Sequence, residues 1–220
     1  MSILDPDDLR GVLFDVDGTL VDTNYLHTIS WAQAFRQYGH TVAMSKIHRA
    51  IGMGGERLVD SLLPDAREDH DDIVSAHAAL MAAHWPSLVP LPGATDLLDW
   101  TSAAGLKVVL ASSASGRELK ALLAALGDPE TVDVTTYASD VEHTKPDPEL
   151  VQLSLDRAKL RAEDVVFVGD AVWDIEAAAR ADVPAVGLLS GGTSGAELRD
   201  AGAVEIYDDP ADLLATACAG

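Results

Sequence analysis

The sequence predicts an α/β protein, with a doubly wound parallel sheet and a helical segment inserted after its first strand. Three observations support this prediction. Short apolar runs recur along the chain, helical stretches alternate with the later runs, and a long segment after the first run has helical stretches but no strand-like run. Strands that alternate with helices are typical of a parallel sheet covered on both faces.

The predicted strands are apolar runs at residues 11–16, 106–111, 165–168 and 185–189. Each run is rich in Val, Leu, Ala or Phe and lacks the alternation of apolar and polar residues. Such runs indicate strands that are buried on both faces of a parallel sheet. Residues 132–138 form a weaker candidate strand.

The helices expected between these strands lie at residues 116–126, 148–159, 172–181 and 195–201. In the first of them, four leucines recur at helical spacing and form one apolar stripe. We therefore expect these helices to cover the sheet.

Residues 20–90 are expected to form a separate helical cap domain, whereas residues 1–19 and 91–220 form the α/β core domain. Pro and Gly residues cluster where the chain re-enters the strand and helix pattern, as in a linker. The helices expected in the insertion are at 28–38, 46–51, 57–63 and 70–84.

The composition is that of an acidic globular protein. The 220 residues include 36 Asp and Glu against 15 Lys and Arg, which gives a net charge of −21. Such a charge disfavours nucleic acids and anionic membranes as partners. The sequence has no signal peptide and no apolar run long enough to span a membrane, so we expect a cytoplasmic protein. Its expected partner is a small molecule, and the sequence leaves open a monomer or a homodimer.

Polar and charged side chains follow the predicted strands at their carboxyl ends, where open α/β sheets bind ligands. In chain order they are Asp15, Asp17, Ser112, Ser113, Lys145, Asp170 and Asp174. Because the carboxyl ends of parallel strands meet at one edge of the sheet, we expect these side chains to share one crevice.

Several carboxylates that meet in one crevice repel each other, and a hard divalent cation relieves that repulsion. Oxygen ligands with room for water suit Mg²⁺, which is therefore the expected cofactor. Lys145 supplies a positive charge and Ser112 a hydroxyl donor for phosphoryl oxygens. Gly18 allows the backbone to turn its amide groups toward an anion.

These residues resemble the four motifs of the haloacid dehalogenase superfamily, and specifically its capped Mg²⁺-dependent phosphatases and β-phosphoglucomutase-like proteins. The stretch Asp15-Val16-Asp17-Gly18-Thr19-Leu20 is similar to the first motif. Ser112 resembles the second motif, Lys145 the third, and the stretch from Gly169-Asp170 through Asp174 the fourth. The resemblance implies a Rossmann-like core with a helical cap inserted after the first strand.

The resemblance also implies the roles of these residues in hydrolysis of a phosphate monoester. Asp15 is the nucleophile and forms an aspartyl-phosphate. Asp17 protonates the leaving oxygen and then deprotonates the attacking water. Ser112 and Lys145 hold the phosphoryl oxygens, and Lys145 also offsets the charge of Asp15.

The implied metal ligands are Asp15, the backbone carbonyl of Asp17, and Asp170, with Asp174 as either a direct or a water-mediated ligand. Substrate contacts are expected from Gly18, Thr19, Ser113, Arg49 and His27. Arg49 precedes a glycine-rich stretch similar to the cap loop of related enzymes, although an exposed arginine at a helix end fits equally well. His27 is close enough to the first motif to line the cleft, and a packed histidine or a hinge histidine is its alternative.

Two other functions remain open. A β-phosphoglucomutase-like sugar phosphomutase resembles this chain closely, but those mutases carry Glu before the metal-binding Asp, where this sequence has Gly169. A non-catalytic module that binds phosphate or metal is the second alternative, and the intact pair of Asp15 and Asp17 argues against it.

Three histidines of the insertion, His70, His77 and His84, are spaced by seven residues. This spacing places them on one face of a helix and about 10 Å apart, which is too far to share a metal ion. We expect this face to be solvated.

Overall fold

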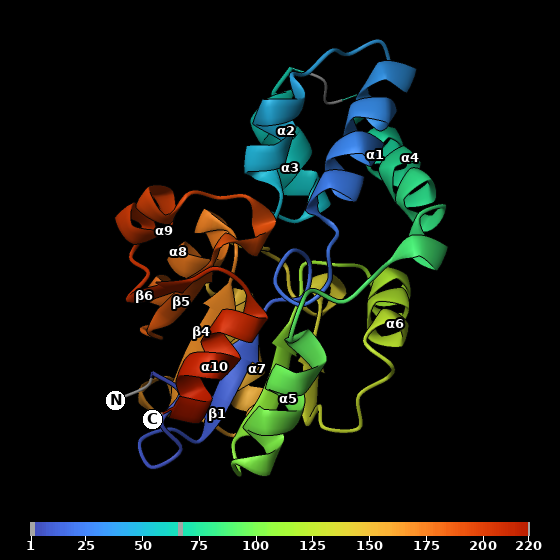
Figure 1. Cartoon of the computed structure of the whole chain (residues 1–220). Helices are drawn as coiled ribbons and strands as arrows, with labels where there is room; N and C mark the ends of the chain where they lie inside the picture. The colour runs from blue at the N-terminus through green and yellow to red at the C-terminus, as the bar shows by residue number, and fades with distance from the viewer. Residues whose placement is uncertain (1–2, 66–67, 220) are drawn as a thin grey trace.

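The computed structural model describes residues 3–65 and 68–219. In this part of the chain, six parallel strands form one sheet in the order β3-β2-β1-β4-β5-β6 (Figure 1). The strands are β1 (Gly11–Phe14), β2 (Lys107–Ala111), β3 (Val134–Thr136), β4 (Val165–Gly169), β5 (Ala185–Leu188) and β6 (Glu205–Tyr207).

Helices cover both faces of this sheet, which confirms the predicted doubly wound α/β fold. Alternate residues of β1 point to opposite faces of the sheet, where Val12 and Phe14 face one apolar core and Leu13 faces the other. The first core is closed by α5 (Ala94–Ala103), α6 (Gly116–Ala125) and α10 (Pro210–Ala219). The second is closed by α7 (Glu149–Ala158), α8 (Val172–Arg180) and α9 (Gly195–Ala201).

Each of the four helices expected within residues 20–90 is present in the structure. They are α1 (Asn24–Gln37), α2 (Met44–Ala50), α3 (Gly55–Leu62) and α4 (His70–Ala82). They surround an apolar core of their own, which includes Trp31, Phe35, Ile47 and Ile73. We call this segment the α1–α4 insertion, and it lies beyond the carboxyl ends of the strands (Figure 1).

The central strand β1 determines where the polar residues meet. Phe14, its last residue, pairs with Leu110 of β2 and with Val168 of β4. The hydrogen bond from Asp15 N–H to the Val168 carbonyl continues this pairing one residue further. The residues that follow β1, β2 and β4 therefore leave the sheet side by side.

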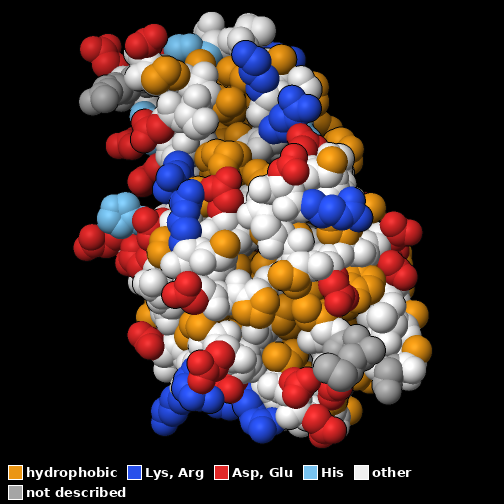
Figure 2. Space-filling model, turned by 90° about the vertical axis from the view of Figure 1, so that its left-hand side faces the viewer, with side chains coloured by type: hydrophobic (Ala, Val, Ile, Leu, Met, Phe, Trp, Pro, Cys, Tyr) orange, Lys and Arg blue, Asp and Glu red, His pale blue; other side chains and the backbone are white. Residues whose placement is uncertain are grey.

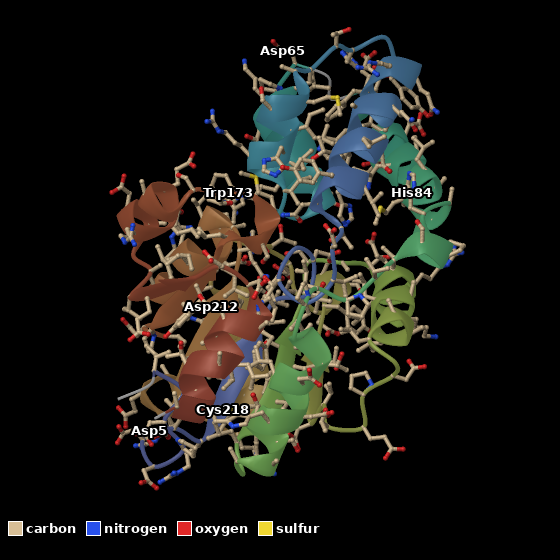
Figure 3. The ribbon with its side chains drawn as sticks, viewed as in Figure 1. Asp5, Asp65, His84, Trp173, Asp212 and Cys218 are labelled. Carbon is tan, nitrogen blue, oxygen red and sulfur yellow. The ribbon has the colours of Figure 1, made fainter. Side chains whose placement is uncertain are left out.

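The charges are spread over the surface seen in Figure 2, where acidic side chains occur from the α1–α4 insertion to the opposite end of the molecule. Cys218 is exposed and lies on α10, away from the insertion (Figure 3). No helix in the described residues has both the length and the apolar character that a membrane crossing requires.

Candidate active site

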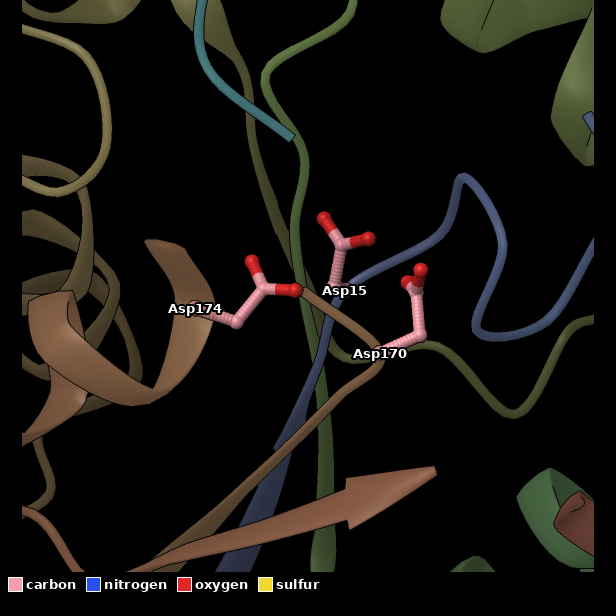
Figure 4. A group of neighbouring side chains, drawn as sticks. All are labelled: Asp15, Asp170 and Asp174. Carbon is pink, nitrogen blue, oxygen red and sulfur yellow. The ribbon is translucent and has the colours of Figure 1, made fainter. Parts of the chain in front are cut away.

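Three buried carboxylates from three chain segments meet at the carboxyl edge of the sheet. Asp15 follows β1, Asp170 follows β4, and Asp174 lies in the first turn of α8 (Figure 4). One oxygen from each of the three lies within 4.8 Å of the others. Asp174 is fixed by the local fold, because its Oδ2 accepts a hydrogen bond from the Ala171 N–H at the start of α8 (3.1 Å).

Lys145 lies against two of these carboxylates and is completely buried. Its ammonium donates to Asp15 Oδ1 at 2.5 Å and to Asp174 Oδ1 at 2.8 Å. Asp15 Oδ2 makes no hydrogen bond within the described chain, so this oxygen is available for a ligand. Burial alone would lower the pKa of Lys145, but Asp15 and Asp174 raise it above its usual value, so Lys145 is charged.

The cluster holds an excess of negative charge. Burial raises the pKa of Asp15 well above its usual value, although Lys145 opposes this shift. Burial and the neighbouring Asp174 raise the pKa of Asp170 to about 7. Three carboxylates face one ammonium, so a bound divalent cation would balance the remaining charge. The all-oxygen donor set fits Mg²⁺ in particular.

Asp170 is held in place by residues from the first loop and from α1. Thr19 Oγ1 donates to Asp170 Oδ1 at 2.8 Å, and Asn24 Nδ2 donates to Asp170 Oδ2 at 2.8 Å. A Cβ atom on Gly191 would overlap the same carboxylate, so only glycine fits at that position. Thr19, expected to contact substrate, therefore directs its hydroxyl to a carboxylate. Asn24 is a residue that the sequence analysis missed.

Asp17 lies beside the α1–α4 insertion and is hydrogen-bonded to one of its histidines. His27 Nε2 lies 3.2 Å from Asp17 Oδ1, and His27 Nδ1 lies 3.2 Å from His77 Nε2. Burial would lower the pKa of His27, but the bond to Asp17 and the charges of Glu118, Asp17 and Asp15 raise it to about 9. Protonated His27 thus donates to both neighbours. Burial would raise the pKa of Asp17, but His27 keeps it below its usual value.

The expectation that His77 lies on a solvated face is wrong. His77 is buried, and its ring stacks on Trp31 with a centroid distance of 3.8 Å. Burial and the charge of His27 lower the pKa of His77 well below its usual value. His77 is therefore the neutral acceptor of the hydrogen bond from His27.

The buried, neutral His77 should make the protein less stable in acid. An unfolded histidine binds a proton below a pH of about 6.5, whereas folded His77 does not, so stability falls as the pH falls below that value. The slope from one such group approaches about 1.4 kcal/mol per pH unit. Between pH 6.5 and 5.5, His77→Gln should flatten the fall in unfolding free energy, measured by urea denaturation.

The matched control for this measurement is His84→Gln, two residues beyond the end of α4 (Figure 3). We expect it to keep the wild-type slope. Equal slopes in wild type and His77→Gln would contradict the neutral state of His77.

The two serines after β2 have different environments. Ser112 is buried, and its Oγ accepts a hydrogen bond from the Ala114 N–H at 3.0 Å. Ser113 Oγ donates to the Gly52 carbonyl of the α1–α4 insertion at 3.2 Å.

The N–H of Gly18 donates to the Val21 carbonyl at 2.8 Å, so this amide is engaged within its own turn, where Gly18 has a φ of +79°.

Arg49 does not reach the site. Its side chain is 76% exposed and lies 3.8 Å from Glu197 on α9. It is also absent from the residues that line the cavity. Of the two interpretations that the sequence left open, the structure matches the exposed arginine at a helix end.

A cavity of about 830 Å³ lies between the sheet and the α1–α4 insertion. Asp15, Asp17 and Ser113 line it from the sheet side, and His27 and His77 line it from the insertion. A further lining residue is Glu118 of α6, which the sequence analysis did not single out. The cavity therefore brings the Asp15 and Asp17 carboxylates, the charged His27 ring and the Ser113 hydroxyl to one partly open space that a small molecule can occupy.

Comparisons with known proteins agree with this geometry. A family model described as haloacid dehalogenase-like hydrolase matches residues 9–182. The chain is 29% identical over 211 residues to the phosphorylated carbohydrates phosphatase of Thermotoga maritima, which covers 94% of this chain and 97% of that protein. It is 32% identical over 193 residues to a phosphoglycolate phosphatase of Yersinia pseudotuberculosis, and this match covers 83% of this chain and 82% of that protein. The solved structure of a hydrolase from Pseudomonas syringae is similar, with a TM-score of 0.91 and 33% sequence identity. The match covers 96% of this chain and 98% of that protein.

Proposed function

We propose a reaction for this chain from one premise: it belongs to the haloacid dehalogenase-like hydrolases and is a phosphoric monoester hydrolase. Its substrate is a small organic phosphate monoester, which it hydrolyses with Mg²⁺ through an aspartyl-phosphate. The observation that carries this proposal is the contact of Lys145 with Asp15 beside Asp170 and Asp174.

In the first step, a carboxylate oxygen of Asp15 attacks the phosphorus atom. The bond from phosphorus to the leaving oxygen breaks, its electron pair stays on that oxygen, and the protonated form of Asp17, a minor form while His27 is charged, supplies the proton that makes it an alcohol. Lys145 and Ser112 bind the phosphoryl oxygens, on which negative charge accumulates.

In the second step, Asp17 is a carboxylate and takes a proton from a water molecule that attacks the same phosphorus atom. The bond between phosphorus and the Asp15 oxygen breaks, which restores the Asp15 carboxylate and releases inorganic phosphate. His27 supports this step, because its hydrogen bond orients Asp17 and favours the charged form of Asp17.

Asp15, Asp170 and the backbone carbonyl of Asp17 would hold Mg²⁺, and Asp174 would contact it directly or through water. The bound ion supplies positive charge that offsets the repulsion between the phosphate and the carboxylates. Thr19 and Asn24 orient Asp170 for this role, since both donate hydrogen bonds to its oxygens.

Two substrate classes fit this proposal, a phosphorylated carbohydrate and phosphoglycolate, because relatives that match most of the chain carry those names. The test is a panel of phosphate esters with purified protein, scored for released phosphate and for sugar phosphate isomers. We expect released phosphate. Transfer of a labelled phosphoryl group back to a sugar phosphate would show a mutase instead. Bound Mg²⁺ without turnover on any ester would show a binding module.

Removal of metal ions with EDTA should abolish phosphate release, and added Mg²⁺ should restore it. At about 100 times its dissociation constant, Mg²⁺ stabilises the folded protein by roughly 2.7 kcal/mol, which raises Tm by about 5–10 °C at this chain length. Asp170→Asn should lose most of this shift in Tm, which differential scanning calorimetry measures. Full activity in EDTA, together with an unchanged Tm on adding Mg²⁺, would contradict the metal assignment.

A further inference from the structure

Glu118 is a carboxylate of the cavity that the proposed reaction does not use. It lies in the first turn of α6, and its side chain is 13% exposed. It lines the cavity together with Asp15 and Asp17. Its side chain forms an ionic contact with His27, whose Nε2 lies 3.8 Å from Glu118 Oε1. The cavity therefore contains a second carboxylate beside the one that handles the leaving oxygen.

The buried cations near this carboxylate are already engaged with protein groups. Lys145 donates to Asp15 and Asp174. Both ring nitrogens of His27 are paired, Nε2 with Asp17 and Nδ1 with His77. The one remaining N–H of the Lys145 ammonium binds the phosphoryl group in the proposed reaction, and His27 has no N–H left, so neither cation is available to a second anionic group on the substrate.

The remaining Arg and Lys side chains do not supply a free cation deep in the cavity. Arg57 is the one Arg or Lys among the described lining residues, and it is exposed at the rim. It donates to the Thr144 carbonyl at 3.4 Å, and the exposed carboxylates of Glu56 and Asp60 line the same rim.

We infer that Glu118 makes the cavity select phosphate esters of neutral, hydroxyl-bearing alcohols over esters whose alcohol part carries a second anion. This inference rests on the proposed function and chooses between its two substrate classes. A carboxylate accepts hydrogen bonds from hydroxyl groups, which favours a polyol. It repels a substrate carboxylate, and the repulsion is strong because the partly enclosed cavity screens it less than bulk water does.

Glu118 also has a structural role that a substitution has to respect. The Ser115 side chain caps α6 by accepting a hydrogen bond from the Glu118 N–H at 3.3 Å, which places Glu118 at the third helical position. At the third helical position of such a cap, glutamine can take the same role as glutamate. Glu118→Gln therefore removes the charge and keeps the helix start.

The experiment compares two esters that differ in charge and have the same number of carbons: 2-hydroxyethyl phosphate and 2-phosphoglycolate. For each, kcat/KM is measured with the wild type in Mg²⁺. We expect the wild type to prefer the hydroxyl ester by at least about tenfold, the effect of one nearby charge in a partly wet site. Glu118→Gln should reduce this ratio by about fivefold or more, mainly by improving hydrolysis of phosphoglycolate.

Glu56→Gln is the matched control, because it removes the same charge at the exposed rim, and it should change the ratio by less than about twofold. A wild-type preference for phosphoglycolate would overturn the inference, whatever the variants do. So would an unchanged ratio in Glu118→Gln. If the wild type hydrolyses no phosphate ester at all, the proposed function itself fails, and the two failures are thereby distinguished.

Discussion

Asp15→Asn should lower kcat by roughly 10⁴-fold or more, in line with the loss of other catalytic nucleophiles. The amide oxygen is too weak a nucleophile to form the phosphoryl intermediate, whereas the side chain keeps its size. The substitution removes one of three mutually repelling buried carboxylates and leaves Lys145 paired with Asp174, so we expect no loss of folding stability. Steady-state release of phosphate from an aryl phosphate measures the activity, and circular dichroism measures the thermal unfolding.

The control for this variant is Asp22→Asn, an exposed aspartate seven residues further along the chain. It should keep wild-type kcat. If Asp15→Asn keeps more than about one tenth of wild-type activity, another residue is the nucleophile.

Lys145→Met should cause a large loss of both activity and stability. Lys145 is completely buried, and its removal leaves Asp15 and Asp174 without their shared cation. Breaking a buried ion pair by removing one partner costs about 3–5 kcal/mol. Loss of a charge that binds the phosphoryl oxygens should lower kcat by a further factor of about 10² to 10³.

Urea denaturation at neutral pH measures the unfolding free energy of this variant, and Lys120→Met is its control. Lys120 is exposed on α6, and its replacement should change stability by less than about 0.5 kcal/mol. Equal stability of Lys145→Met and the control would show that the carboxylates do not depend on Lys145.

The sheet was predictable where its strands are long and buried. The runs that became β1, β2, β4 and β5 are fully apolar or nearly so, and this pattern needs no tertiary context. The three-residue edge strand β6 was not predicted, because it is only partly buried and too short to form an apolar run. Helices α5 and α10 were also not predicted, since their burial depends mainly on packing against each other and the sheet.

The positions of the three site aspartates were predictable for a related reason. Asp15 and Asp170 come directly after buried strands that pair with each other, and Asp174 follows within one helical turn. Their convergence is a consequence of parallel pairing, so strand ends alone indicate it. Their roles and the identity of the metal are carried by the resemblance and remain proposals.

The contact between His27 and His77 beside Asp17 could not be predicted, although His27 was expected to line the cleft, because the two rings meet only through the fold. His27 and His77 are 50 residues apart in sequence, and their rings lie side by side because α1 packs on α4. The spacing of His70 and His77 agrees with their place on one helix, α4, which ends at Ala82 before His84, but it does not say what that helix packs against. His77 packs against Trp31, and no local pattern signals that contact.

The proposed reaction requires Asp15 to carry the phosphoryl group during turnover. The most direct test mixes enzyme, Mg²⁺ and substrate, stops the reaction with acid within one turnover, and maps the modified residue by mass spectrometry after digestion at low pH. We expect one phosphoryl group on Asp15, and borohydride reduction should convert that residue to homoserine. Phosphate release without any phosphorylated Asp15, or with the group on another residue, would contradict this role of Asp15.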